Sequence, residues 1–432
     1  MVANWYDVDK KSQIRRLVVA VAAVATLAFV FPCKPAFAED SPKAEPIKVG
    51  FGIPTSGVAA QDGKQILIAL QLWRDDVNAK GGLLGRPIEL VYYDDQGLAG
   101  KEPGIYRKLL GVDKVDLVIG PYGINAAAAA MRAILDYDGV TISILGAGAN
   151  SIFSNSKYFS MAPSGPDGPK GSSKSFFDFA NQLQPKPRTV AILAADTDSA
   201  RTIADGARAN AVALGFEIAF DKSYQAENSD FGPILREVQA TNVDALFVSA
   251  SSSDTVGIVK AANDIGLAPK MFGGSLPGLQ VTTVKTRLGP LLNGLFVIEN
   301  FAPAFNFPGL ADLLRRYRSA AASAQTDLLG YELVPFGYAA AQVLAQAVEQ
   351  TNSLHSDELA EYIHNNHFET VVGDIEFGKN GEWKNGRTIL TQFQHVNADD
   401  VEQFAEAKVQ PIVWPLRYRT GDILYPYADA RK

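Results

Sequence analysis

Residues 47–95 read IKVGFGIPTSGVAAQDGKQILIALQLWRDDVNAKGGLLGRPIELVYYDD. This stretch opens with an apolar strand, residues 47–53, which the Pro-Thr-Ser-Gly turn at residues 54–57 ends. A helix is predicted next, because apolar residues recur at steps of three and four along one face: Ile66, Leu70, Trp73 and Val77. Gly81 and Gly82 are a strong signal for the end of that helix. Residues 86–93 then read as a second buried strand.

A strand, a helix and a second strand in this order form one βαβ unit, which predicts a parallel sheet. Ligands of such sheets bind beyond the carboxyl ends of the strands. The polar turn around Ser56 lies at that end of the first strand. Ser56 is therefore a candidate ligand-binding residue.

Three pieces of this stretch carry a resemblance to a known family. They are residues 54–57, the run DVNAKGG at residues 76–82 with Leu83 and Gly85, and the paired Asp94 and Asp95. In these pieces the chain resembles the periplasmic leucine/isoleucine/valine-binding proteins, the type I solute-binding family of ABC transporters. The resemblance implies an α/β fold with two lobes that close like a clamshell, each lobe a mostly parallel sheet flanked by helices.

The first 38 residues have the parts of an export signal. Basic residues up to Arg16 precede an uncharged apolar run at residues 17–31, and an A-x-A cleavage site ends at Ala38, before Glu39. The run is shorter than the roughly 20 residues that span a membrane. We predict a signal peptide over residues 1–38, cleaved after Ala38, and a mature protein in the periplasm. A twin-arginine signal and lipidation at Cys33 are weaker alternatives.

Composition narrows the class of protein further. Cys33 is the only cysteine of the 432 residues and lies in the signal, so the exported protein must depend on a hydrophobic core rather than on disulfides. The formal net charge is −7, and no basic run is present. An acidic chain of this kind is a poor nucleic-acid binder.

Strand and helix patterns alternate along the rest of the chain. Pro- and Gly-rich breaks fall at residues 163–171 and 301–309, with a softer break at residues 370–373. A chain this long normally forms more than one domain. We predict two lobes that are each built from two segments: residues 45–163 and 300–370 for lobe 1, and residues 164–299 and 371–432 for lobe 2.

Two candidate ligand-binding loops lie in the first lobe. The turn from Gly120 to Asn125 opens an alanine-rich helix, whose free backbone N–H groups form a natural anion site. The resemblance implies that this turn binds the α-carboxylate of the ligand with help from a serine hydroxyl. This chain has Gly123 and Ile124 at the matching place, so Tyr122 and Asn125 become the candidates. Asn125 has the alternative role of a helix cap.

The second loop of the first lobe is a run of small residues, Gly146, Ala147 and Gly148, which lets a ligand approach the backbone closely. A nucleotide fingerprint is improbable here, because Ser151 replaces its third glycine. The resemblance implies backbone contacts and a threonine hydroxyl for the ligand. Gly148 occupies the threonine position, which leaves the backbone groups. Asp62, after the first turn, is a further candidate or a cap of its own helix.

Three polar loops follow predicted strands of the second lobe. They contain Asp198 with Ser199, Ser251 with Asp254, and Ser275. The resemblance implies aromatic residues near the first two loops, and near Ser275 a glutamate that holds the ligand's ammonium group. Asp198 or Asp254 is a candidate for the missing negative charge, and the alternative for both is N-capping of the next helix.

Signals for catalysis or for a metal are thin. No G-x-S-x-G elbow is present. His364 and His367 lack an acidic partner that would complete a metal site. We therefore expect a binding protein with no cofactor and no metal, rather than an enzyme.

The favoured interpretation is a periplasmic substrate-binding protein that delivers a small ligand to an ABC permease in the inner membrane. The resemblance implies a branched-chain or similar amino acid as the ligand. Because several family contact positions differ, another small organic acid, an amide or an aromatic compound remains an alternative. A ligand sensor that docks onto a signalling partner is a further alternative.

Overall fold

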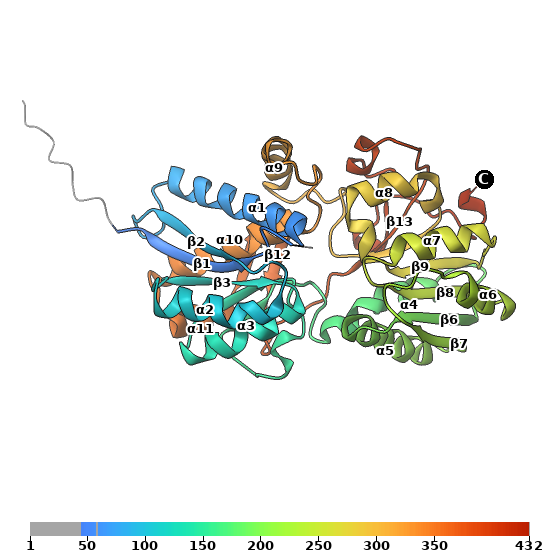
Figure 1. The fold of residues 1–432 in the computed structure, drawn as a ribbon, viewed down its shortest axis with the longest axis horizontal. Coiled ribbons are helices and arrows are strands. Elements are labelled where there is room, and N and C mark those ends of the chain that lie inside the picture. Colours follow the sequence, from blue (N-terminus) through green and yellow to red (C-terminus); the bar gives the residue numbers. More distant parts are fainter. Residues whose placement is uncertain (1–44, 58, 432) are drawn as a thin grey trace, which may run out of the picture. The chain divides into compact units, whose positions relative to one another are not determined.

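The computed structural model describes residues 45–57 and 59–431. The predicted signal peptide, its cleavage site and Cys33 lie outside these residues. Two large sheets dominate the described part, and each is flanked by helices (Figure 1). The predicted α/β class with parallel sheets is confirmed.

The first sheet has five strands in the order β2-β1-β3-β4-β5, and all its neighbours run parallel. The opening βαβ unit lies in it as predicted, with Ile47 opposite Ile88 and Ile53 opposite Asp94. The strands are β1 (Ile47–Ile53), β2 (Ile88–Asp94), β3 (Leu117–Tyr122), β4 (Thr141–Ile144) and β5 (Tyr158–Ser160).

Helices cover both faces of this sheet. The helix α1 packs on one face through Ile66, Leu70 and Trp73, which are almost fully buried with residues of α10. On the other face α2 and α3 enclose a smaller apolar cluster, and Figure 1 shows them on the side of the sheet opposite α1. The helices of this part are α1 (Ala60–Ala79), α2 (Glu102–Gly111), α3 (Ile124–Asp136), α9 (Leu310–Ala324), α10 (Leu333–Thr351) and α11 (Ser356–Asn365).

The second sheet has seven strands in the order β14-β13-β10-β9-β8-β6-β7. The five strands from β10 to β7 in this order are parallel to their neighbours. The strands β13 and β14 pair antiparallel at the other end of the sheet. The strands are β6 (Thr189–Ala195), β7 (Glu217–Tyr224), β8 (Ala245–Ser249), β9 (Met271–Ser275), β10 (Phe296–Glu299), β13 (Ile389–Gln392) and β14 (Ile412–Trp414).

Two apolar clusters enclose the second sheet, one on each face. One cluster contains residues of α6 and α7, and the other contains phenylalanines of α4 and alanines of α5. The alternation of strand and helix patterns that the sequence shows is present in this part of the structure. Its helices are α4 (Lys174–Ala180), α5 (Asp198–Ala213), α6 (Gly232–Ala240), α7 (Thr255–Asp264) and α8 (Thr282–Leu288).

The strands β11 (His367–Thr370) and β12 (Gly373–Glu376) form a hairpin. Its packing indicates to which lobe this segment belongs. Phe368, Ile375 and Trp383 are buried in the same core cluster as the first sheet. The Ser160 N–H also donates to the Gly381 carbonyl at 2.9 Å. The lobe boundaries remain a prediction, and these contacts lead us to move the last crossing from residue 370 to the segment between Trp383 and Ile389.

Parallel pairing determines where ligand-binding loops can lie. Each parallel strand must be followed by a crossover, so the carboxyl ends of neighbouring strands collect at one edge of each sheet. In the first sheet that edge carries the loops after β1, β3 and β4. In the second sheet it carries the loops after β6, β8 and β9.

The buried face of α1 makes a testable contribution to stability. Leu70 is fully buried, whereas Val112 at the end of α2 is 72% exposed. Leu70→Ala should lower the free energy of unfolding by about 2–5 kcal/mol, because it removes apolar contacts and leaves a cavity. Val112→Ala should change it by less than about 0.5 kcal/mol. Urea denaturation of both variants checks this, and equal midpoints would contradict the packing described.

Candidate functional site

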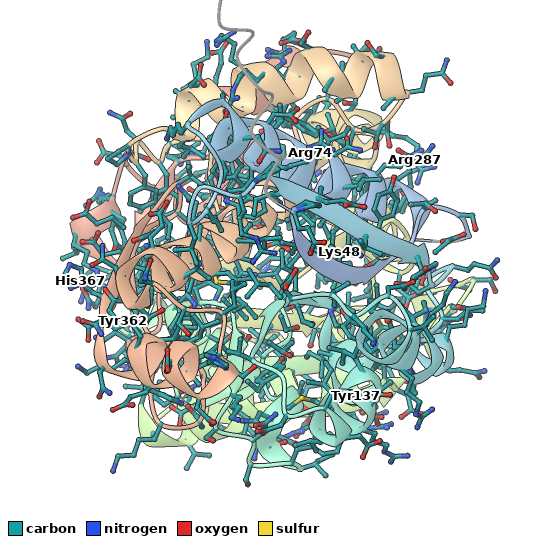
Figure 2. All side chains as sticks on the ribbon, turned by 90° about the vertical axis from the view of Figure 1, so that its left-hand side faces the viewer. Lys48, Arg74, Tyr137, Arg287, Tyr362 and His367 are labelled. Carbon is teal, nitrogen blue, oxygen red and sulfur yellow. The ribbon has the colours of Figure 1, made fainter. Side chains whose placement is uncertain are left out.

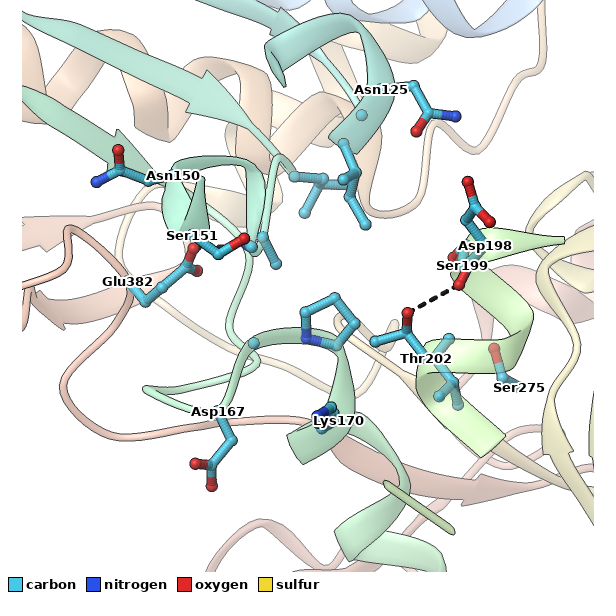
Figure 3. Close-up of a pocket in the computed structure, with 18 of the residues that line it drawn as sticks. Asn125, Asn150, Ser151, Asp167, Lys170, Asp198, Ser199, Thr202, Ser275 and Glu382 are labelled. Carbon is cyan, nitrogen blue, oxygen red and sulfur yellow. Dashed lines mark hydrogen bonds between the residues drawn. The ribbon is translucent and has the colours of Figure 1, made fainter. Parts of the chain in front are cut away.

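A cavity of about 1160 Å³ lies between loops of the two sheets (Figure 3). The first sheet contributes the loops after β3 and β4, and the second contributes those after β6, β8 and β9. The structure brings most of the sequence-predicted residues together in its lining: Tyr122, Asn125, Ala147, Gly148, Asp198, Ser199, Ser251 and Ser275. The other four, Ser56, Asp62, Gly146 and Asp254, are not among its lining residues.

The start of α3 presents unpaired donors to this cavity. Gly123 is the N-cap, with a φ of 86° and no side-chain hydrogen bond to the helix. The first N–H groups of a helix have no partner within it. The Asn125 side chain makes no hydrogen bond in the described part of the chain and points across the cavity toward Asp198 (Figure 3). Its alternative role as a helix cap therefore has no support in this geometry.

The turn after β4 meets a carboxyl group that the sequence did not single out. Gly148 has a φ of 77°, and its N–H donates to Glu382 Oε1 at 2.7 Å. Glu382 is 3% exposed, and burial raises its pKa to about 7 against the lowering effect of the Gly148 N–H. The Gly146 carbonyl is also occupied, because it accepts from the Tyr158 hydroxyl at 2.7 Å.

In the loop before α5, the residue that caps the helix is Thr197 and not Asp198. Thr197 is the N-cap, and its hydroxyl accepts from the Ala200 N–H at 3.3 Å. Asp198 instead pairs with Arg201 at 2.6 Å, and its side chain is 91% exposed. Part of the negative charge of Asp198 is therefore compensated by its own helix. Ser199 lies beside it at the cavity wall (Figure 3).

Asp254 stabilises a loop instead of facing the cavity. It is 2% exposed and accepts hydrogen bonds from the Ser251 hydroxyl at 2.6 Å and from the Glu227 N–H at 3.0 Å. Asp254 occupies the N-cap position of α7, as the alternative from the sequence has it, but its side chain makes no hydrogen bond to the start of the helix. A carboxylate that already accepts these donors has little capacity left for a ligand.

Ser56 and Asp62 lie beside the first turn. The Ser56 hydroxyl donates to Asp94 Oδ2 at 2.5 Å, and the Thr55 N–H donates to Asp94 Oδ1 at 2.9 Å. Asp94 thus ties the first turn to the end of β2. Burial, followed by the charge of Asp327, raises the pKa of Asp62 to about 6.

The segment before α10 supplies a second carboxyl group that sequence reasoning missed. Glu332 lines the cavity with Asn300 and Gln280, is 5% exposed, and accepts from Asn300 Nδ2 at 2.9 Å. Burial, and next the charge of Glu299, raises the pKa of Glu332 to about 8. No local motif marks this residue, because only the fold brings residue 332 to the loops after β3 and β9.

Neither His364 nor His367 is among the residues that line the cavity. His364 Nε2 lies 2.7 Å from the Ser156 carbonyl oxygen, and the ring packs on Phe159. His367 is exposed at the periphery (Figure 2). Within residues 45–57 and 59–431, no group of acidic, histidine or cysteine side chains is arranged to hold a metal ion. No helix among these residues is long and apolar enough to cross a membrane.

Comparison with known proteins agrees with this architecture. Residues 46–398 match the family model described as "Periplasmic binding protein", so the chain belongs to that family. The Leu/Ile/Val-binding protein homolog 2 of Brucella abortus is 24% identical over 339 residues, 78% of this chain and 87% of the relative. A leucine-, isoleucine-, valine-, threonine- and alanine-binding protein of Pseudomonas aeruginosa is 23% identical over 81% of this chain and 90% of its own length.

Solved structures share the fold at lower identity. A branched-chain amino acid transporter substrate binding protein from Streptococcus pneumoniae, in complex with isoleucine, has a TM-score of 0.67 at 20% identity, covering 86% of this chain and 100% of its own. A solute binding protein from Rhodopseudomonas palustris, in complex with 3,4-dihydroxybenzoic acid, has a TM-score of 0.67 at 18% identity, covering 82% and 94%. The fold is therefore the two-lobed type I fold of periplasmic binding proteins.

These findings define the class of protein. The chain is a periplasmic binding protein, similar to binders of branched-chain amino acids, and it is not an enzyme. The interpretation of the sequence as a member of this family is confirmed.

The buried Glu332 makes stability depend on pH. Its pKa is raised from 4.5 to about 8 in the folded protein, so the folded state holds this proton more tightly than the unfolded state. The stabilisation is complete below pH 4.5 and is lost as the pH rises toward 8. Each pKa unit corresponds to about 1.4 kcal/mol. Glu332→Gln should therefore melt at a higher temperature than the wild type at pH 8, and this advantage should shrink toward pH 5.

Glu376→Gln is the matched control for this comparison, because the Glu376 side chain is 47% exposed in an ion pair with Lys384. It should show no gain at pH 8. Differences from the wild type at each pH isolate Glu332 from other buried groups that titrate in the same range. A Glu332→Gln variant that is less stable than the wild type at pH 8 would contradict the burial of an uncompensated carboxyl group.

Proposed function

We propose that this protein is the periplasmic substrate-binding component of an ABC importer for amino acids. The cavity contains a place for a negatively charged group and a place for a positively charged group of the same ligand, and the proposal depends on this observation. The start of α3 offers free N–H groups to an anion, and the buried Glu332 offers a carboxyl group to a cation. An α-amino acid carries both charges on one carbon.

The first part of the proposed binding mode concerns the carboxylate. Helix N-termini favour anions because the unpaired N–H groups and the helix dipole act together. The N–H groups at Ile124 and Asn125, with the Asn125 amide, would receive the α-carboxylate. This arrangement replaces the serine hydroxyl that the family resemblance led us to expect.

The second part concerns the ammonium group. Ser275 occupies the region where the resemblance implies a glutamate, and it cannot supply a negative charge. Glu332 and Gln280 line the same cavity as Ser275. An ammonium group next to Glu332 would favour the ionised carboxylate and offset part of the cost of burying it.

The transport mechanism follows from the two lobes. The ligand would bind first to the loops of the first sheet, and closure would then bring Ser199, Ser251 and Ser275 to it. The gain in the closed population is limited by the difference between the ligand's affinities for the closed and open forms. A permease in the inner membrane would recognise the closed form. The predicted signal peptide, cleaved after Ala38, supports export to the periplasm.

One structural relative favours a second candidate function. The Rhodopseudomonas palustris protein was solved with an aromatic acid, 3,4-dihydroxybenzoic acid. An aromatic or other small organic acid is therefore the alternative ligand class. Against it, Tyr122 is the only aromatic residue that lines the cavity in the described part of the chain, so few rings are available to stack on such a ligand. A sensor that docks onto a signalling partner has no specific observation in its favour.

A thermal-shift screen tests the proposed function. A ligand at 100 times its dissociation constant stabilises the protein that binds it by about 2.7 kcal/mol. At least one L-amino acid should raise the melting temperature, and its decarboxylated amine should not. If 3,4-dihydroxybenzoic acid and related acids raise the melting temperature while no amino acid does, the proposal is wrong and the alternative replaces it.

The Asn125 amide provides a test of the carboxylate subsite. Asn125→Ala should weaken binding of the amino acid found in the screen by about 1.5–3 kcal/mol, because a hydrogen bond to a charged group is lost. Because the Asn125 side chain makes no cap bond, the free energy of unfolding of the Asn125→Ala variant should differ from that of the wild type by less than about 0.5 kcal/mol. Calorimetry and thermal melting measure the two effects separately.

Asn365→Ala is the matched control, because Asn365 is an exposed asparagine in the last turn of α11 and outside the cavity. It should leave affinity unchanged. Equal affinities for the wild type and Asn125→Ala would remove Asn125 from the site.

A further inference from the structure

Glu382 occupies the turn where a family-type ligand would bind. Its Oε1 atom accepts the Gly148 N–H at 2.7 Å, so this backbone donor is already used by the protein. The resemblance to the leucine/isoleucine/valine-binding proteins had led us to expect that the turn offers backbone groups to the ligand. In this chain, the Glu382 carboxyl group occupies one of those backbone donors, the Gly148 N–H.

The second oxygen of Glu382 has no partner. Glu382 Oε2 is buried and makes no hydrogen bond in the described part of the chain, although Glu382 lines the cavity. The Ser160 hydroxyl lies near the Glu382 carboxyl and lowers its pKa as a hydrogen-bond donor, but it makes no well-aligned hydrogen bond to Oε2. A buried polar atom without a partner costs about 1–3 kcal/mol, so such an atom in a binding cavity calls for a donor from outside the protein.

The position of Glu382 is fixed by the loop that carries it. The Glu382 carbonyl accepts from the Gly378 N–H at 2.7 Å, and Gly381 approaches the Tyr158 carbonyl so closely that no side chain would fit there. The neighbouring Trp383 is 2% exposed in the first core cluster. Glu382 therefore has little freedom to leave the Gly148 turn when a ligand arrives.

The side-chain amide of Asn150, which also lines the cavity, is already used as a donor. Both hydrogen bonds from Asn150 Nδ2 go to backbone carbonyls, those of Asn155 and Asn380, at 2.8 and 3.1 Å. Figure 3 shows Glu382 beside Ser151, on the side of the cavity away from Asp198 and Ser199. The two buried carboxyl groups of the cavity thus come from different parts of the fold, Glu332 before α10 and Glu382 after β12.

We propose that Glu382 determines the ligand specificity of this cavity and that the protein prefers amino acids whose side chains end in a nitrogen donor. This inference rests on the proposed amino-acid function and adds the chemistry of the ligand's side chain. With the α-carboxylate at the start of α3 and the ammonium group at Glu332, the side chain would extend toward Glu382 Oε2. Apolar walls at Leu145 and Ala147 would contact its methylene groups.

The chemistry of the subsite discriminates among ligand classes. A second carboxylate on the ligand would face Glu382 and be repelled. A ligand with a branched apolar side chain would leave Oε2 without a partner. Such a ligand should bind more weakly, because a site built for hydrogen bonding rejects a ligand that lacks the donor. An ammonium or carboxamide N–H donates to Oε2 while Oε1 keeps its bond to the Gly148 N–H.

Isothermal titration calorimetry on the purified protein with L-lysine, L-glutamine and L-leucine tests the inference. L-lysine or L-glutamine should bind at least tenfold more tightly than L-leucine. Glu382→Gln keeps an acceptor for the Gly148 N–H but puts an amide in place of the carboxylate. It should weaken the binding of the preferred nitrogen-donor ligand at least tenfold and leave L-leucine binding within about twofold.

Glu376→Gln is the control, because it makes the same change at an exposed residue of the same segment and should alter none of these affinities. Tighter binding of L-leucine than of both nitrogen-donor ligands overturns the inference, even if Glu382→Gln fails to fold. Unchanged L-lysine and L-glutamine binding in a folded Glu382→Gln variant overturns it as well. In both cases the proposed amino-acid function survives, whereas the absence of binding by every amino acid in the wild type defeats that function itself.

Discussion

Parallel strand pairing is the constraint on which the rest of this structure depends. All five strands of the first sheet, and the strands from β6 to β10 of the second, run parallel to their neighbours. A parallel pair cannot be closed by a tight turn, so helices must return the chain across the faces of each sheet. The helices pack on the faces of the sheet, and the loops after the carboxyl ends of the strands therefore lie together at one edge. The cavity of about 1160 Å³ is lined by such loops from both sheets.

Buried charge is concentrated where the chain passes between the two sheets. Lys285, Glu299 and Glu332 are each nearly fully buried there, and Lys285 Nζ lies 3.6 Å from the centre of the Tyr331 ring. Burial lowers the pKa of Lys285 and raises that of Glu299, while their mutual attraction opposes both shifts. Removing one member of such a group is costly because the remaining charge is left without compensation.

The relatives share the scaffold of this protein at low sequence identity. Relatives at 23–24% identity cover about four-fifths of the chain, as expected when the core pattern is retained. The cavity has Gly123 and Ile124 at the helix start, Gly148 in the turn after β4 and Ser275 after β9, with carboxyl groups from Glu332 and Glu382. Specificity depends on individual hydrogen-bond partners in a cavity, whereas the sheets determine where the cavity lies. The proposed preference for an amino acid therefore depends on these few positions.

Local patterns in the sequence predicted the parallel sheets and the loops that surround the cavity. Apolar periodicity at Ile66, Leu70 and Trp73 predicted α1 correctly, because burial of one helix face is a local pattern that spacing alone reveals. The loops after β3, β4, β6, β8 and β9 were predicted for the same reason, since strand ends are visible in the chain and parallel pairing brings them to one edge. Eight of the residues singled out in these and neighbouring loops line one cavity.

Tertiary structure alone decided which polar side chains face that cavity. Asp254 and Asn125 are both polar residues beside predicted strand ends, yet Asp254 accepts from Ser251 of its own loop and from Glu227 of the loop after β7, whereas the Asn125 side chain makes no hydrogen bond in the described part of the chain. Glu332 and Glu382 carried no local signal, because each reaches the cavity only through the fold: Glu382 bonds to Gly148, which is 234 residues away, and Glu332 bonds to Asn300, which is 32 residues away. Hydrogen-bond partners and burial depend on contacts that are distant along the chain, and no local periodicity encodes them.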